Sequence, residues 1–268
     1  MTRARVDAAF TKASTTDRAA LVGYLPAGFP TVEGAGVVIE AMVEGGVDIV
    51  EVGLPYSDPV IDGPTIQVAA DMALRGGVRT RDVFSTVERV AALGVPTLVM
   101  TYWNPVERYG VDRFAAALAA AGGAGLITPD LIPEEAAEWI AASDAHELDR
   151  VFLVAPSSTQ ARLAATAEAS RGFVYAVSVM GVTGARAVTS RLAPDLVSRT
   201  RAFTDLPIGV GLGVSDGRQC AEVAAYADAV IVGSAFVRRV LDHPDDVPAA
   251  AAACRLLAAD LATGLKRA

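Results

Sequence analysis

The sequence contains few of the residues that form disulfides or bind metals. Its 268 residues include two cysteines and two histidines. Cys220 and Cys254 do not form a CxxC pair and no histidine lies near either, so we expect buried or half-buried thiols in a reducing compartment. His146 and His243 lack metal-ligand spacing and lie far from predicted strand ends, so we expect both at the surface and predict no metal site.

Positive charge and long apolar runs are also scarce. There are 23 Lys+Arg against 31 Asp+Glu, which gives a net charge of −8. This excess of acid argues against a nucleic-acid binder, although backbone N–H groups would still allow phosphate binding. The uncharged run 114–129 is shorter than the roughly 20 residues of a membrane span, and residues 1–20 lack the apolar core of a signal peptide. We therefore expect a cytoplasmic protein that binds neither nucleic acid nor membrane.

Two kinds of segment alternate along the chain. Between apolar, strand-like runs lie Ala-, Glu- and Arg-rich stretches with helical spacing, several of which begin at residues such as Thr31, Thr80 and Pro133 and end in glycine, as at Gly45 and Gly94. The eight apolar runs span residues 20–28, 47–55, 96–104, 123–129, 150–156, 173–179, 206–213 and 227–234. Alternating strands and helices imply a parallel sheet, and eight units fit the roughly 250 residues of a (β/α)8 TIM barrel. A doubly wound open sheet is the alternative.

The rest of the chain fits the same architecture. Residues 1–19 predict an extra helix before the first strand, and residues 245–268 predict a long closing helix. No stretch has the composition of a linker, so we expect residues 1–268 to form a single barrel domain. In such a barrel the active site lies at the carboxyl ends of the strands, which makes polar residues near those ends candidates for function.

Glu51 is the first such candidate. It lies inside the apolar run 47–55, between Val50 and Val52. A carboxylate there is expected to point into the barrel and to lose part of its hydration, which raises its pKa and suits acid–base chemistry near neutral pH. The alternatives are a glutamate paired with a structural Arg or Lys, or one facing solvent at an irregular strand.

The segment 54–67 follows directly. It contains three prolines and two carboxylates, Asp58 and Asp62, between a predicted strand and a predicted helix. Loops on this face of a barrel often carry function. Asp-Pro and Asp-Gly are also ordinary turn dipeptides, so turn formation alone is the alternative for each aspartate.

Three glycine-rich segments, 181–186, 211–214 and 233–236, follow the last three predicted strands. Barrels frequently bind phosphate with the loops after strands seven and eight and with a short helix N-terminus. Bare backbone N–H groups and the positive end of the helix dipole attract the anion there, and Ser234 adds a hydroxyl donor. The sequence therefore predicts a phosphate site at these ends.

The residues so far resemble one known family. The string EVGLPYSDPVIDGPTIQ (51–67) is similar to a motif of the tryptophan synthase alpha subunit. Six further segments fit that family in the same order: GYLPAGFP (23–30), TYWNPVERYG (101–110), PDLIPEE (129–135), GVTGAR (181–186), GVGLGV (209–214) and VIVGSAFV (230–237). The resemblance implies a (β/α)8 barrel that cleaves indole-3-glycerol phosphate by a retro-aldol reaction to indole and glyceraldehyde 3-phosphate, in the last steps of tryptophan biosynthesis.

The resemblance also implies roles for individual residues. Glu51 matches the family's acid/base carboxylate, and Asp62 matches the carboxylate that accepts a hydrogen bond from the indole N–H. Tyr102 matches a residue of the indole pocket, Tyr175 a tyrosine near the catalytic glutamate, and Thr183 the threonine of a loop that closes over the substrate. The residues that match the phosphate cradle are Gly184, Gly213, Gly233 and Ser234.

A protein partner follows from the same resemblance. The alpha subunit itself needs no cofactor and passes indole to a beta subunit that contains pyridoxal phosphate, in an alpha2beta2 heterotetramer. Asp58 matches the loop that signals to that subunit. Pro55, Tyr56 and the 104–110 loop, beginning with Asn104 and Pro105, are expected to face the partner, because an exposed tyrosine flanked by proline suits an interface.

Three other functions remain open at this point. A stand-alone lyase of the same family would release free indole and would not depend on a beta subunit. A different phosphate-binding barrel, such as a sugar-phosphate isomerase, would share the late glycine-rich loops but has no reason to carry the whole 51–67 string. A barrel retained only to bind or regulate a partner would tolerate Glu51→Gln without loss of function.

Overall fold

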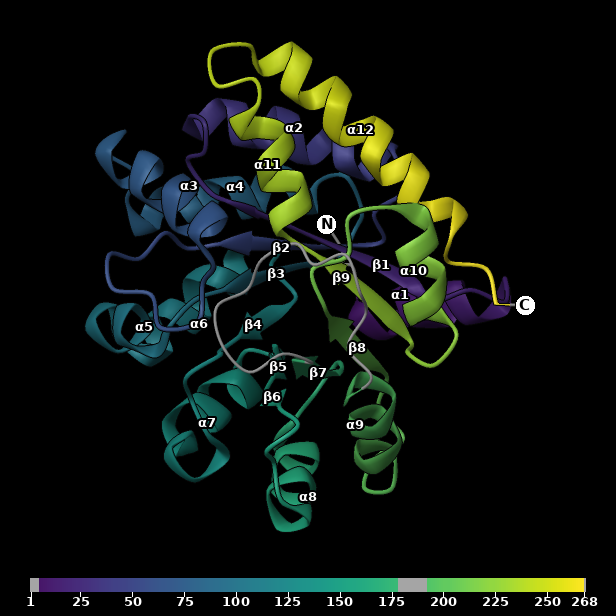
Figure 1. Ribbon diagram of the computed structural model, residues 1–268. Helices are drawn as coiled ribbons and strands as arrows, with labels where there is room; N and C mark the ends of the chain where they lie inside the picture. Colours follow the sequence, from purple (N-terminus) through teal and green to yellow (C-terminus); the bar gives the residue numbers. More distant parts are fainter. Residues whose placement is uncertain (1–4, 178–191, 268) are drawn as a thin grey trace.

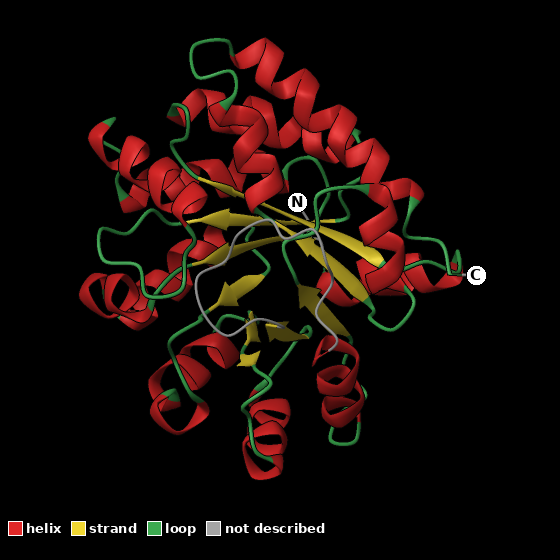
Figure 2. Ribbon diagram, in the orientation of Figure 1, coloured by secondary structure: helices red, strands yellow, loops and turns green. Residues whose placement is uncertain are grey.

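The computed structural model describes residues 5–177 and 192–267, with strands at the centre and helices around them (Figures 1 and 2). The strands are β1 (Ala20–Pro26), β2 (Ile49–Gly53), β3 (Thr97–Met100), β4 (Gly125–Ile127), β5 (Asp149–Val151), β6 (Leu153–Val154), β7 (Val174–Val177), β8 (Ile208–Gly211) and β9 (Ala229–Val232). The helices are α1 (Val6–Thr15), α2 (Val32–Glu44), α3 (Pro64–Arg75), α4 (Thr80–Ala91), α5 (Trp103–Tyr109), α6 (Val111–Ala120), the 3-10 helix η1 (Pro133–Glu135), α7 (Ala137–Ala145), α8 (Gln160–Ala169), α9 (Leu192–Arg201), α10 (Gly217–Ala224), α11 (Ser234–Leu241) and α12 (Val247–Thr263).

The strands form one parallel sheet in the order β5-β4-β3-β2-β1-β9-β8-β7-β6. β5 and β6 stand at the two ends of this order, yet only Phe152 separates them in sequence. Two buried clusters cover the two faces of the sheet: an inner core inside the barrel and an outer core between the strands and the helices. Val151 and Leu153 contact the inner core, while Phe152 and Val154 contact the outer core. Side chains therefore keep alternating between the two faces across the break at Phe152. The sheet therefore closes as a (β/α)8 barrel, as predicted. The predicted strand 150–156 is one strand position divided in two, and the open doubly wound sheet is excluded.

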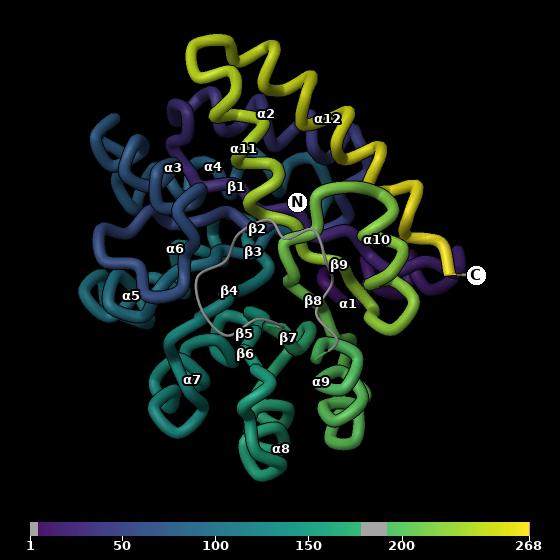
Figure 3. Tube along the Cα trace, in the orientation of Figure 1, coloured from purple at the N-terminus to yellow at the C-terminus, as the bar shows by residue number. Residues whose placement is uncertain are grey.

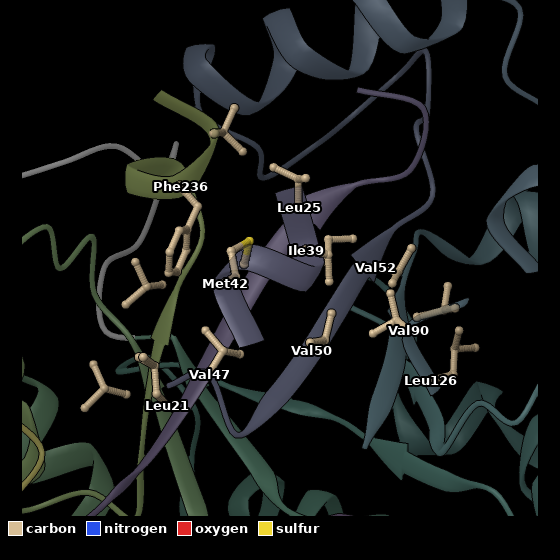
Figure 4. Packing of buried hydrophobic residues seen from close by; sticks show 14 of the residues in the cluster. Leu21, Leu25, Ile39, Met42, Val47, Val50, Val52, Val90, Leu126 and Phe236 are labelled. Atoms are coloured by element: carbon tan, nitrogen blue, oxygen red, sulfur yellow. The ribbon is translucent and has the colours of Figure 1, made fainter. Parts of the chain in front are cut away.

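Most strand residues are apolar because both faces of the sheet are covered. On β2, Val50 and Val52 lie in the outer core between strands and helices, while Ile49 belongs to the inner core. Figure 4 shows this outer layer, where Val50 lies near Ile39 and Met42 of α2. Since side chains alternate along a strand, Glu51 shares the inner side with Ile49.

Helix α1 covers the amino-terminal end of the barrel. Val6, Phe10 and Ala13 belong to the inner core, and the Phe10 ring lies 5.7 Å from the ring of Phe173, just before β7. The extra N-terminal helix is thus confirmed. The predicted closing helix is α12, which lies along α2 at the outside of the barrel, as the chain trace shows (Figure 3).

Several helix boundaries follow from caps. The Thr31 hydroxyl accepts a hydrogen bond from Gly34 N at 2.9 Å and begins α2, as predicted. The predicted helix start at Pro133 is wrong by four residues: residues 133–135 form the 3-10 helix η1, and α7 begins at Ala137.

Helix α5 was not predicted, because its residues were assigned to the end of a strand (96–104) and to a loop (104–110). β3 instead ends at Met100 and α5 begins at Trp103. The carboxylate of Asp130, after β4, accepts hydrogen bonds from Trp103 N at 2.9 and 3.2 Å. Because Asp130 lies 27 residues further along the chain, it satisfies the Trp103 N–H of the first turn without leaving a capping residue next to the helix in the sequence.

Candidate active site at the carboxyl end of the barrel

Glu51 is the buried carboxylate of the barrel interior. Only 1% of its surface is exposed, and its Oε1 atom has no hydrogen-bond partner among the described residues. Burial raises the pKa of this carboxyl group from 4.5 to about 8. Its burial rules out the alternative of a glutamate that faces solvent, and no Arg or Lys of residues 5–177 and 192–267 forms an ion pair with it. At neutral pH it holds a proton that it can donate.

Two tyrosines flank Glu51. Tyr24 of β1 is its register partner on the neighbouring strand, and Tyr175 lies on β7. Burial raises the pKa of each phenol well above 10, and the charges of Glu51 and Asp62 raise both further, which places all four groups in one electrostatic neighbourhood.

Glycines make room for both tyrosines. A Cβ atom on Gly53 would lie 2.4 Å from the Tyr24 hydroxyl oxygen, and one on Gly211 would lie 2.6 Å from that of Tyr175. Both distances are far below contact, so the strands beside the tyrosines require glycine here. The family resemblance predicts Tyr175 at the site but gives no role to Tyr24, whose sequence signal is a polar aromatic residue inside the apolar run 20–28.

Asp62 is held by Tyr102, which precedes α5. The Tyr102 hydroxyl accepts hydrogen bonds from Val60 N and Ile61 N, both at 3.1 Å. Its side chain also bonds the Asp62 carboxylate, which lowers the pKa of Asp62, while burial raises that pKa by more. One phenol therefore connects Val60, Ile61 and Asp62 and helps to fix the loop around them.

The two predicted phosphate-binding ends lie on neighbouring strands. Gly213, with φ +70°, follows β8, and Gly233 with Ser234 joins β9 to the start of α11. A Cβ on Gly233 would lie 3.3 Å from the Tyr24 ring, so this end of the barrel adjoins the group around Glu51. The half-buried Gly233 and Ser234 lie at a helix N-terminus, an arrangement suited to an anion.

The third glycine-rich segment, 181–186, lies outside the described residues. Thr183 and Gly184, which the family resemblance places over the substrate and in the phosphate cradle, both belong to it.

The residues expected to face a partner gather at one surface. Tyr56, Asp58, Asn104 and Pro105 line a cavity of about 440 Å³, and Asn104 Nδ2 donates to the Tyr56 hydroxyl at 3.0 Å. Pro55 is the exception: it is buried, so in this structure it supports the loop rather than presenting a surface. Tyr56 is half-buried rather than exposed, because its ring lies 5.4 Å from that of Tyr102.

The remaining sequence predictions concern residues away from this site. Cys220 and Cys254 are free and buried, as predicted, and burial raises the pKa of each thiol to about 12. His146 and His243 are half-buried. Within residues 5–177 and 192–267, no three His, Cys, Asp or Glu side chains are grouped so as to hold a metal ion. None of the helices in these ranges has the length and apolar character needed to cross a membrane.

Comparisons with known proteins agree with one another. Residues 10–266 match the family described as Tryptophan synthase alpha chain. The tryptophan synthase alpha chain of Acidothermus cellulolyticus is 66% identical over 93% of this chain and 92% of its own length. That of Salinispora tropica is 62% identical over 98% of each chain. A chain of Mycobacterium tuberculosis tryptophan synthase superposes with a TM-score of 0.92 at 56% identity and covers 100% of both chains. The alpha chain of Legionella pneumophila gives a TM-score of 0.85 at 28% identity over 98% of each.

Proposed function

The chain belongs to the tryptophan synthase alpha chain family, and we propose that Glu51 and Asp62 carry out the reaction of that family in this protein. That reaction cleaves indole-3-glycerol phosphate to indole and glyceraldehyde 3-phosphate. The observation that supports the assignment most strongly is Glu51 itself, a carboxyl group with 1% exposure on the inner face of β2 and a pKa of about 8.

Glu51 serves first as an acid and then as a base. At neutral pH its carboxyl group is protonated, because burial holds its pKa at about 8. It gives this proton to the indole ring carbon that bears the glycerol chain, which interrupts the aromatic system. The resulting carboxylate then takes the proton of the adjacent side-chain hydroxyl. As that O–H bond breaks, the new carbonyl forms, the carbon–carbon bond cleaves and its electron pair restores the indole ring. Glu51 ends the cycle protonated.

Asp62 stabilises the positive charge that develops on the indole ring between the two proton transfers of Glu51. Protonation of the ring carbon places positive charge on the indole, whose N–H becomes a stronger donor. A fixed carboxylate at that N–H binds the transition state more tightly than the neutral substrate. Tyr102 supports this role, since its hydrogen bonds to Val60 N, Ile61 N and the Asp62 side chain fix the carboxylate in place.

The rest of the substrate extends across the barrel mouth. Gly213, Gly233 and Ser234 would hold the phosphate with backbone N–H groups and a hydroxyl, and Gly184 would complete that cradle. By family resemblance Tyr102 would form one side of the indole pocket, and Tyr175 lies in the electrostatic neighbourhood of Glu51. By family resemblance, closure of Thr183 over the substrate excludes water from the carboxylates.

The protein works as a subunit in this proposal. Indole passes to a beta subunit, which alone contains pyridoxal phosphate, in a cytoplasmic alpha2beta2 heterotetramer; this chain is one catalytic domain without a cofactor. Support for the docking face comes from the Tyr56–Tyr102 ring contact at 5.4 Å, which connects the surface around Asp58 and Asn104 to the loop of Asp62. A stand-alone lyase that releases free indole is the less favoured alternative.

The test of this assignment is Glu51→Gln, which keeps the shape of the side chain and removes the transferable proton. A positioned acid/base contributes roughly 10²–10⁴-fold, so kcat for indole formation should fall by at least that factor. Glu44→Gln, an exposed position at the end of α2, is the matched control and should keep full activity. Full activity of Glu51→Gln would contradict the proposal.

A further inference from the structure

The proposed reaction places a negative charge on Glu51 that the resting structure does not accommodate. Oε1 of this side chain is buried and has no hydrogen-bond partner among the described residues. Burial is the only cause that acts on the pKa of the Glu51 carboxyl, so no described cation offsets a charge there. A carboxylate formed in such surroundings requires a hydrogen-bond donor.

Four titratable groups from different elements share the neighbourhood of Glu51: Tyr24 on β1, Asp62 after β2, Tyr102 after β3 and Tyr175 on β7. Asp62 is an acceptor when ionised and repels a second carboxylate. The Tyr102 hydroxyl is already engaged by Val60 N, Ile61 N and the Asp62 side chain. The available donors are therefore the phenols of Tyr24 and Tyr175.

The position of Tyr24 suits this role. Tyr24 and Glu51 are register partners on adjacent parallel strands, so both side chains project from the same face of the sheet at the same level. The Tyr24 ring passes Gly233 on one side, and its hydroxyl lies over Gly53, on the inner face of β2 two residues beyond Glu51. No described residue forms a hydrogen bond with this hydroxyl, so its proton is available.

We propose that Tyr24 is a positioning residue whose phenol hydroxyl donates a hydrogen bond to the Glu51 carboxylate when that carboxylate is ionised. The inference rests on the proposed function for its importance in catalysis, but the contact itself can be tested without turnover. Burial and the two nearby carboxylates hold the pKa of Tyr24 well above 10, so the phenol keeps its proton at every pH at which Glu51 titrates.

The direct test is the pKa of Glu51 in the Tyr24→Phe variant of the full chain. The side-chain carboxyl is followed by ¹³C NMR with labelled glutamate, and Glu51→Gln identifies its resonance. A donor to the ionised form lowers a pKa, so removing it should raise the pKa of Glu51 by about one unit. Tyr226→Phe is the matched control, because it also removes a single phenol hydroxyl, here the buried hydroxyl of a half-buried residue just after α10. An unchanged pKa in Tyr24→Phe overturns the proposal.

A second variant, Gly53→Ala on β2, disturbs the same Tyr24–Glu51 contact. The Cβ atom of Gly53→Ala would lie 2.4 Å from the Tyr24 hydroxyl oxygen and must displace it. This variant should also raise the pKa of Glu51, and it should add nothing further in a Tyr24→Phe background. If Gly53→Ala raises the pKa equally in both backgrounds, the effect does not pass through the phenol and the proposal fails.

Turnover separates this inference from the proposed function. With indole-3-glycerol phosphate, Tyr24→Phe should lower kcat about tenfold with little change in KM, and the alkaline limb of kcat should shift to higher pH by the same unit as the pKa. A shifted pKa together with full activity of Glu51→Gln would refute the catalytic assignment and leave the Tyr24–Glu51 contact intact. An unchanged pKa of Glu51 in Tyr24→Phe together with an inactive Glu51→Gln would refute the Tyr24–Glu51 contact and leave the catalytic assignment intact.

Discussion

At the scale of the residue, Glu51 shows how burial alone can prepare an acid. Its two neighbours, Val50 and Val52, are buried in the outer core, which leaves the carboxyl group inside the barrel without a described partner. The alternation of a strand and the apolar run around it predict both this direction and the raised pKa. They do not predict Tyr24, because the contact depends on which strand lies beside β2 and on the space above Gly53.

The raised pKa of Glu51 also makes a prediction about stability. The pKa is about 8 in the folded chain against an ordinary value of 4.5, so between these values the unfolded state ionises and the folded state does not. Stability from this group is therefore fully present below pH 4.5 and is lost by pH 8. Glu51→Gln does not ionise and should be more stable than the parent chain by roughly 3 kcal/mol at pH 7.

Urea unfolding of both proteins between pH 5 and pH 8 measures this difference. The advantage of Glu51→Gln should grow as the pH rises and level off near pH 8. An advantage that does not change with pH would mean that Glu51 titrates normally in the folded chain.

At the scale of the element, the loop between β2 and α3 depends on a residue from another strand. Tyr102 follows β3, yet its hydroxyl holds Val60 N, Ile61 N and the Asp62 side chain. The sequence predicted a functional loop at 54–67 and placed Tyr102 near the indole only by family resemblance. It gave no signal for this hydrogen-bond network, since the partners lie about 40 residues apart.

Tyr102→Phe should therefore loosen the loop. The variant loses the acceptor of two backbone N–H groups and the donor to Asp62. A hydrogen bond to a charged group contributes about 1.5–3 kcal/mol, so kcat/KM should fall roughly tenfold or more. Hydrogen exchange of the 60–62 amides, measured beside kcat/KM, should become faster. Unchanged exchange and unchanged kcat/KM would show that Tyr102 does not organise this loop.

The elements themselves were predicted unevenly, and the reasons are physical. Strands covered on both faces give continuous apolar runs, which located every strand position of the barrel. Helix α5 was missed because its cap, Asp130, comes from a distant loop. The interruption at Phe152 was missed because the residues on both sides of it keep the alternation of a single strand.

At the scale of the whole molecule, one end of the barrel is closed and the other carries the chemistry. Helix α1 covers the amino-terminal end with Val6, Phe10 and Ala13. The carboxyl end gathers Glu51, Asp62, Gly213 and Gly233. The alternation of strands and helices predicted a barrel with its site at the carboxyl ends, and residues 1–19 predicted an extra helix but not that it covers the other end; the reaction itself came from the family motifs. Local patterns could not identify the substrate, because it is recognised by groups from several strands at once.

The same end presents the surface expected to meet a partner. The ring of Tyr56 contacts that of Tyr102, and the Tyr102 side chain bonds Asp62. Binding of a partner at the surface around Tyr56 can therefore change the position of the Asp62 carboxylate. Such a connection predicts that the lyase reaction depends on the beta subunit.

The measurement that tests this account most directly is indole release from indole-3-glycerol phosphate by the purified chain, with and without a tryptophan synthase beta subunit. A coupled alpha subunit should release indole slowly on its own and much faster with the partner. Fast release that ignores the partner would contradict the role as a coupled subunit, and no indole under either condition would contradict the lyase reaction itself.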